Sequence, residues 1–291
     1  MRGQFIIGFI TGTLGLFWLG CGMMPGGDAL PPPEVILTGP PTATNHTTLP
    51  LPTLETNLTQ SPPATVPATV PATDDGVATY NLALQKDQTG HPGEAAALYS
   101  KAADLGVPQA QYNLGYLHEH GQAGLQQDIT LAVQWYNKAA EQNLPEAQHM
   151  LGVLHTEGRG VPANHATAFS WFDKAAQQGL PVAEYQLGVL YAVGQGVETN
   201  AEQAAQWFLR AAEQGVPDAQ FQIGHRYAQG EGIEQDIIQA YAWFHVAAVD
   251  GKHQAALEAK RGVHARMSSE QVTAGQVAYS KLLENLQNTT P

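Results

Sequence analysis

The sequence predicts an all-α fold built from tandem two-helix repeats between residues 78 and 254. Two observations carry this prediction. Trp135, Trp171, Trp207 and Trp243 follow one another at intervals of 36 residues, and each has an Ala-Ala pair four and five residues after it. A period of this length is typical of repeats in which two helices form one unit.

The second helix of each unit is marked at both ends. Seven residues before each Trp stands an Asp or Asn, which can accept from the free N–H groups of a first helical turn. Eight residues after the Trp position stands a Gly or Asn, the types that tolerate the left-handed conformation at a helix end. The first set is Asp128, Asn164, Asn200 and Asp236; the second is Gly106, Asn143, Gly179, Gly215 and Gly251.

The first helix of each unit carries Ala, then Leu or Ile four residues later, then Gly. Residues at this spacing share one helix face, which we expect to pack against the partner helix. The sets are Ala110-Leu114-Gly115, Ala147-Leu151-Gly152, Ala183-Leu187-Gly188 and Ala219-Ile223-Gly224.

Together, Ala-x-x-x-Leu-Gly, the Gly-x-Gly-Val loops and Ala-x-x-Trp-[Phe/Tyr]-x-x-Ala-Ala-x-x-Gly resemble Sel1-like repeats, relatives of tetratricopeptide repeats. The resemblance implies a right-handed α-solenoid whose first helices line a concave surface. The expected units are a degenerate repeat at 78–109, repeats at 110–146, 147–182, 183–218 and 219–254, and a tail at 287–291. Residues 255–286, with the capping-box pattern Ser268-Ser-Glu-Gln271, are expected to form helices that cap the array.

The first 20 residues have the layout of a signal peptide. Arg2 precedes an apolar run from Phe5 to Leu19, which is short for a membrane span. Gly20 and Cys21 resemble a bacterial lipoprotein signal, in which the cysteine is lipidated; Trp18 departs from that pattern, where Leu is usual. An ordinary secretion signal or an uncleaved anchor is the alternative.

Residues 21–77 are predicted to be a disordered tether. From Gly22 to Asp75 there are twelve prolines, many threonines and no Lys or Arg, so the segment cannot build a core. A recognition tract for proline-binding grooves is the alternative, although regular PxxP spacing with flanking Arg is missing.

Charge and residue types limit the function. With 13 basic and 26 acidic residues, the formal net charge is -13, which argues against nucleic acid and leaves a cationic partner or one not selected by charge. His118 and His155 lack a ligand partner at helical spacing, the glycine loops lack the features of a phosphate loop, and no nucleophile motif is present. We therefore expect no enzyme activity, no catalytic residue, no metal and no cofactor.

The predicted binding site is a set of side chains on the first helices. The ring row is Tyr80, Tyr112, His149, Tyr185 and Phe221, and the second row is Leu84, Tyr116, Val153, Val189 and His225. Tyr112 is turned about 200° from Ala110, hence away from the packed face, so the rings are expected to point into the groove. Tyr116 and His225 are the second-row members expected to bind with them. Inter-repeat packing of these rings is the alternative.

These features predict a monomeric scaffold that binds a protein or peptide in its groove. Its lipidated N-terminus would hold it at a membrane of the bacterial envelope, with the periplasmic side of the outer membrane favoured. A soluble periplasmic or secreted protein is the alternative location. A protein that binds or modifies peptidoglycan, and a purely structural spacer, are the alternative functions.

Overall fold

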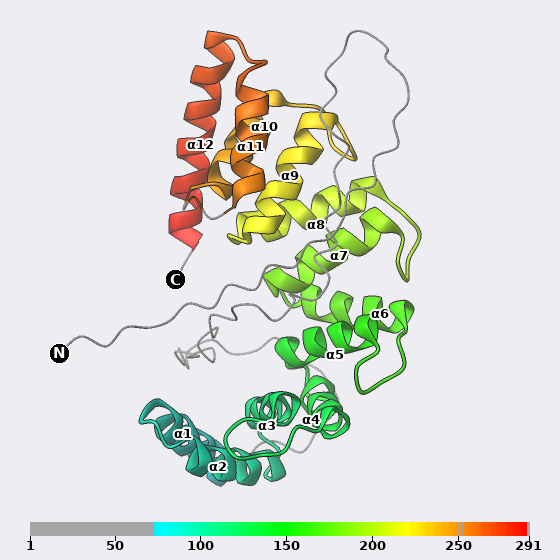
Figure 1. Ribbon diagram of the computed structural model, residues 1–291, viewed down its shortest axis with the longest axis vertical. Helices are drawn as coiled ribbons and strands as arrows, with labels where there is room; N and C mark the ends of the chain where they lie inside the picture. Colours follow the sequence, from blue (N-terminus) through cyan, green and yellow to red (C-terminus); the bar gives the residue numbers. More distant parts are fainter. Residues whose placement is uncertain (1–72, 250, 252, 290–291) are drawn as a thin grey trace, which may run out of the picture. The chain divides into compact units, whose positions relative to one another are not determined.

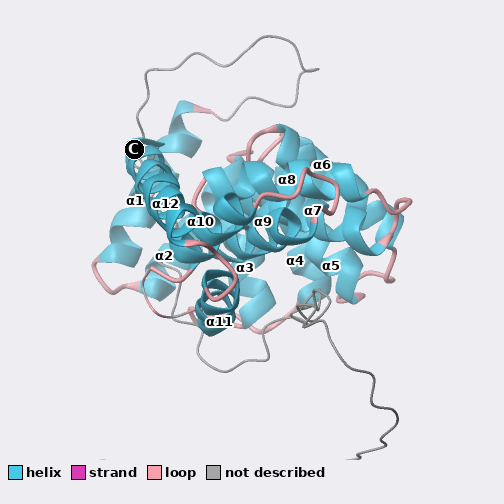
Figure 2. Ribbon diagram, turned by 90° about the horizontal axis from the view of Figure 1, so that it is seen from above, coloured by secondary structure: helices cyan, strands magenta, loops and turns pink. Residues whose placement is uncertain are grey.

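The computed structural model describes residues 73–249, 251 and 253–289. Within these residues the fold is all-α, as predicted, with twelve helices and no strand (Figures 1 and 2). The helices are α1 (Asp74–Gln88), α2 (Pro92–Asp104), α3 (Pro108–His120), α4 (Ile129–Glu141), α5 (Pro145–Glu157), α6 (His165–Gln177), α7 (Pro181–Val193), α8 (Ala201–Glu213), α9 (Pro217–Gln229), α10 (Ile237–Ala247), α11 (Gln254–His264) and α12 (Ser269–Thr289). The predicted signal peptide, Cys21 and residues 21–72 of the predicted tether lie outside the described residues.

Helices α1 to α10 form five consecutive pairs. Each odd-numbered helix packs against the even-numbered helix that follows it, and α3, α5, α7 and α9 also pack against the even-numbered helix that precedes them. From α3 to α9 the odd helices begin at a proline, whose missing N–H is no loss in a first turn. The pairs that start with α3, α5, α7 and α9 therefore begin two residues before the predicted repeat boundaries.

The predicted helix caps are confirmed. The N–H of Leu131 donates to Asp128 Oδ1 at 2.9 Å, and Asn164, Asn200 and Asp236 cap α6, α8 and α10 in the same way. At the other end of the even helices the backbone is left-handed, and Asn143 reaches φ 62° there without being a glycine. In the first pair, His91 precedes α2 without a side-chain hydrogen bond to it.

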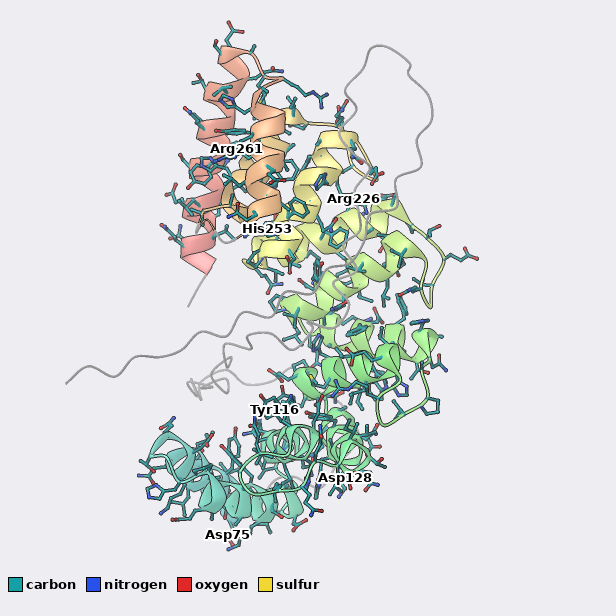
Figure 3. All side chains as sticks on the ribbon, in the orientation of Figure 1. Asp75, Tyr116, Asp128, Arg226, His253 and Arg261 are labelled. Atoms are coloured by element: carbon teal, nitrogen blue, oxygen red, sulfur yellow. The ribbon has the colours of Figure 1, made fainter. Side chains whose placement is uncertain are left out.

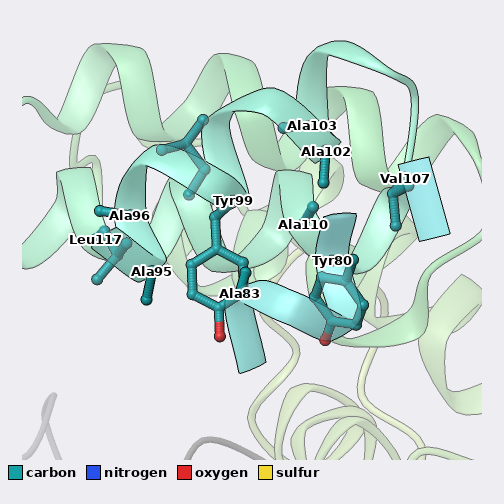
Figure 4. Packing of buried hydrophobic residues seen from close by; sticks show 11 residues of the cluster. Tyr80, Ala83, Ala95, Ala96, Tyr99, Ala102, Ala103, Val107, Ala110 and Leu117 are labelled. Atoms are coloured by element: carbon teal, nitrogen blue, oxygen red, sulfur yellow. The ribbon is translucent and has the colours of Figure 1, made fainter. Parts of the chain in front are cut away.

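The Ala-Leu face of each odd helix packs on the even helix of the preceding pair. Ala110 and Leu114 of α3 lie in one cluster with α2 residues such as Ala102 (Figure 4), and Ala147 and Leu151 of α5 lie in one cluster with α4. The expectation that this face meets the helix of its own unit was wrong. Helical spacing defines which residues share a face, but it does not say which neighbour covers that face.

The C-terminal helices close the last pair. The predicted capping box is present, with Ser268 N–H donating to Gln271 Oε1 at 2.9 Å and Gln271 N–H to Ser268 Oγ at 3.2 Å. Helix α12 packs on α10, where Tyr279 stacks on His245 at 3.9 Å between ring centroids. Leu282 of α12 packs against the cluster that contains Trp243, which is only 2% exposed.

Candidate functional site: the faces of the odd helices

Every member of the ring row packs against an aromatic ring of its own pair. The partner ring is the residue that follows the Trp position on the even helix. Ring centroids are 5.5 to 5.9 Å apart and the planes are tilted by 45° to 55°. The ring pairs are Tyr80–Tyr99, Tyr112–Tyr136, His149–Phe172, Tyr185–Phe208 and Phe221–Phe244.

The repeated glycine makes room for these ring pairs. A Cβ atom on Gly152 would lie 2.7 Å from the ring of Phe172, and one on Gly188 would lie 2.6 Å from Phe208. Such distances are too short for two carbon atoms in van der Waals contact. The expectation that Tyr112 points away from its partner helix was therefore wrong, because an odd helix between two even helices buries two faces.

The predicted binding residues differ in access. Tyr80 and Phe221 are 9% and 7% exposed, whereas Tyr112, Tyr116, His149, Tyr185 and His225 are half-buried. His253 stands just before α11 (Figure 3), and its ring lies 4.7 Å from that of Phe221 and helps to cover it. Each ring of the ring row is covered on one side by its partner ring. The role of the two rows in binding stays a prediction.

Two members of the second row, Tyr116 and His225, have aromatic neighbours. The Tyr116 ring lies 4.1 Å from that of His120 on its own helix, with the planes tilted by 31°, while His225 contacts Phe221 and Phe244 at 4.6 and 5.0 Å. Val189 is buried in a cluster with α8. The half-buried members of the ring row, Tyr112, His149 and Tyr185, lie on α3, α5 and α7.

Burial favours the uncharged forms of these half-buried rings. It lowers the pKa of His149 to about 4 and raises the pKa of Tyr185 to about 12. It also raises the pKa of Tyr112 to about 12, and the charges of Glu146 and Glu119 add to this rise. The rings can therefore contribute apolar contact and neutral hydrogen bonds to a partner.

One buried ion pair was missed by the sequence interpretation. Glu119 is 2% exposed; it accepts from Tyr136 Oη at 2.8 Å and pairs with Arg159 at 3.0 Å. Arg159 lies in the loop after α5 and pairs with Glu157 as well, at 3.1 Å. The two partners of Glu119 come from a later helix and a later loop, so no local pattern could indicate them.

A second buried carboxylate departs from the repeat pattern. Gln111, Gln148 and Gln220 each donate to a backbone carbonyl of the preceding even helix, and Glu184 stands at the same place in α7. The carboxylate is fully buried, pairs with Arg210 at 2.9 Å and accepts from Gln214. Burial raises the pKa of Glu184, and Arg210 opposes the rise. This replacement of Gln by Glu was visible in the sequence.

Cations of the even helices α4, α6 and α8 lie above the repeated tryptophans. Lys138 lies 3.8 Å from the ring centre of Trp135, and Lys174 lies 4.1 Å from that of Trp171. Arg210 lies 4.7 Å from Trp207 while it pairs with Glu184. These cations cover the half-buried indoles, which assigns them a packing role.

Two further kinds of site were sought among the described residues. No three or more His, Cys, Asp or Glu side chains there come together as ligands for a metal ion. In the same part of the chain, no helix has both the length and the apolar character of a membrane span.

Comparisons with known proteins agree with the helix pairs. The model of the Sel1 repeat family matches residues 77–107, 108–144, 145–180, 181–216 and 217–248. Among solved structures, a protective antigen of uropathogenic Escherichia coli with an SLR fold is 30% identical with a TM-score of 0.66, and the match covers 72% of this chain and 46% of that one. A Sel1 repeat protein from Oxalobacter formigenes is 33% identical with a TM-score of 0.58, over 62% of this chain and 76% of that one.

A search of curated proteins gave no match. The chain spans less than half of the E. coli antigen, which is the longer protein of the two. The family match covers more than half of the present chain, and its five segments coincide with the five helix pairs, which confirms the predicted α-solenoid. This chain belongs to the Sel1-repeat family.

Proposed function

We propose that this chain is a non-catalytic scaffold that binds a segment of another protein along its odd-numbered helices. Sel1-repeat proteins generally mediate protein–protein interaction, and the repeat is generally a non-catalytic scaffold. The observation that carries the proposal is the half-buried row Tyr112, His149 and Tyr185 on α3, α5 and α7.

This row suits an extended or helical segment for a physical reason. Each ring is fixed on one side by its ring pair, so little conformational entropy would be lost when a partner covers the other side. Aromatic side chains held in this way are the residue types that commonly anchor protein partners. One ring per repeat offers a partner contacts at regular intervals.

We further propose that the scaffold is attached to a membrane of the bacterial envelope, with the periplasmic side of the outer membrane favoured. The support comes from the sequence: Arg2 and the apolar run Phe5–Leu19 lead to Gly20-Cys21, and the proline-rich tether follows. Acyl chains on Cys21 would bind the bilayer, and the tether would hold the repeats away from its surface.

Site-specific photo-crosslinking in cells tests the scaffold role. Val182 in the first turn of α7 is 44% exposed and shares a helix face with Tyr185, so a photoreactive residue there would not disturb the core. Gln206 on α8 is exposed and serves as the matched position on an even helix. We expect a specific adduct from position 182 only. Equal adducts from both positions, or none from 182, would contradict the proposal.

A further inference from the structure

Helix α11 stands in the chain where a sixth odd helix of the array would begin, but no even helix packs along it. Both α11 and α12 pack on α10, and Figure 2 shows α11 set apart from α12. Lys260 stands 36 residues after Gly224, at the place where α3, α5, α7 and α9 have glycine. That glycine makes room for a ring of the even helix, and a lysine leaves no such room. One side of α11 is therefore without a partner helix among the described residues.

One side of α11, here called the α11 face, combines an apolar side chain with basic ones. Three basic residues lie three, four and seven positions after Leu257, a spacing that places all four on the same side of a helix: Lys260, Arg261 and His264. Leu257 and Lys260 are half-buried, whereas Arg261 (Figure 3) and His264 are exposed. The ring of His264 lies 5.9 Å from that of Tyr241, so the α11 face borders the contact with α10.

The start of α11 is held beside the last member of the ring row. His253 caps α11, because its Nδ1 accepts from the N–H of Ala256 at 3.1 Å, and its ring lies 4.7 Å from that of Phe221. The Nε2 atom of His253 also lies 3.4 Å from Asp218 of α9. Leu257 stands one turn into α11, 36 residues after Phe221. The α11 face therefore adjoins the surface assigned above to partner binding.

The cations of the α11 face have no acidic partner among the described residues. Neither Lys260 nor Arg261 takes part in an ion pair there, although every arginine of the five helix pairs does: Arg159, Arg210 and Arg226. Helix α11 has two cations and one acid, whereas acids outnumber cations in the five helix pairs. The formal net charge of -13 favours a cationic partner for the chain as a whole, but the local charge on α11 has the opposite sign.

We infer that the α11 face binds an acidic stretch of the partner protein, with carboxylates of that stretch paired with Arg261 and Lys260. This inference rests on the proposed scaffold function and specifies the chemistry of the part of the partner that reaches α11. Arginine can donate to both oxygens of one carboxylate, and Leu257 offers apolar contact to a neighbouring side chain. The acidic helix pairs would repel an extended polyanion, so a short acidic stretch suits the α11 face better than nucleic acid or an anionic membrane.

Two labelled peptides provide the probe: one of alternating Glu and Ala, and one of alternating Gln and Ala, which has the same shape without the charge. Binding to the full-length chain is followed by fluorescence anisotropy at low salt. Arg261→Gln removes one cation from the α11 face, and Lys101→Gln removes one from an exposed site on α2. We expect the Glu peptide alone to bind, with affinity about fivefold weaker for Arg261→Gln and changed by less than about twofold for Lys101→Gln. Circular dichroism should show that both variants keep the helix content of the wild type.

A zero-length carbodiimide cross-link gives a readout that needs no variant. In the wild-type chain, a Glu carboxylate of the bound peptide should condense with the amine of Lys260 to an amide, the carbodiimide taking up the water, and Lys101 should not react. Equal loss of affinity in the two variants, no binding of the Glu peptide, or an amide at Lys101 in place of Lys260 would each overturn the inference. Sedimentation with phosphatidylglycerol vesicles adds a second arm: vesicle binding that depends on Arg261, without binding of the Glu peptide, would replace the acidic stretch with a lipid surface.

Failure of this inference can be told apart from failure of the scaffold role. A photoreactive residue at position 258, which is exposed on α11, should capture the same partner as position 182, through a stretch rich in Asp and Glu. A partner captured from position 182 that gives no adduct at 258, or one in a stretch without Asp or Glu, would overturn the inference and leave the scaffold role standing. Absence of any specific adduct at position 182 would contradict the scaffold role, whatever the peptides do.

Discussion

The ring of Phe172 fills the space that a side chain on Gly152 would need, with its nearest carbon atoms 2.7 Å from the position of that Cβ. The same relationship recurs between Gly188 and Phe208 and between Gly224 and Phe244. The glycine after the Leu or Ile of each odd helix therefore sets how closely the two helices of a pair approach.

Gly152→Ala should lower the free energy of unfolding by about 1–3 kcal/mol, because the added methyl group forces the ring of Phe172 out of place. Gly93→Ala is the matched control, because nothing lies within 4 Å of a Cβ there and alanine favours the helix. Urea unfolding followed by circular dichroism measures both. If the Gly152 variant were as stable as the wild type, the close approach of the two helices of the pair would not restrict the residue at position 152.

Removal of Arg210 should destabilise the fold, because the buried carboxylate of Glu184 loses its charged partner. At pH 7, Arg210→Ala should lower the free energy of unfolding by about 1–3 kcal/mol, and the double variant with Glu184→Gln should recover most of it. Glutamine is the residue that the other repeats have at this place. Strictly additive effects in the double-mutant cycle would show that the two residues do not interact.

The pH dependence of Glu184→Gln alone follows from the raised pKa of Glu184. A raised carboxyl pKa favours the neutral form in the folded chain, so its contribution to stability is present below pH 4.5 and is lost as pH rises. The glutamine variant should therefore gain stability relative to the wild type between pH 4 and pH 7. Denaturant unfolding at the two pH values checks this, and a gain that is larger at pH 4 would contradict it.

Acid should destabilise the fold through His149. Its pKa falls from 6.5 to about 4 on burial, so the neutral ring contributes stability above pH 6.5 that is lost as pH falls toward 4. The loss is at most about 3 kcal/mol for this residue. His149→Tyr, which supplies the ring found at Tyr112 and Tyr185, should make the free energy of unfolding less dependent on pH in this range. The exposed His165, changed to Gln, should leave the pH dependence of the free energy of unfolding as it is in the wild type.

Cys21→Ser should release the protein from membranes, because serine offers no sulfur for acylation. Fractionation of cells that express the variant, together with metabolic labelling by a fatty acid, measures this. A variant that stays in the membrane fraction would speak against the lipid anchor and in favour of an uncleaved apolar segment. Retention of label after the substitution would place the acyl chain elsewhere.

The parts of the fold that were predicted correctly depend on residues close together in the sequence. The N-caps at Asp128 and Asn164, the left-handed Asn143 and the box at Ser268–Gln271 each involve one helix end. Their physical chemistry is local, so short patterns indicate them reliably.

The site was less predictable because it depends on which helices become neighbours. Periodicity placed Tyr112 opposite Ala110, but it could not reveal that α3 lies between two helices and packs on both. Glu119 and Arg159 are 40 residues apart in sequence and meet only in the fold. Glu184 could have been identified from the sequence, because it breaks a glutamine pattern that the other repeats keep.

The placement of α3, α5, α7 and α9 between two even helices makes each repeat depend on its neighbour. Ala147 and Leu151 of the third pair complete the cluster formed by α4 of the second, so a single pair taken alone lacks part of its core. Stability should then spread by nearest-neighbour coupling, as in a one-dimensional chain of linked units. The C-terminal end is held by α12, whereas Val77 and Leu82 of α1 remain 44% and 43% exposed. Amide hydrogen exchange should therefore begin at α1 and advance toward α10, as the repeats unfold one after another from that end.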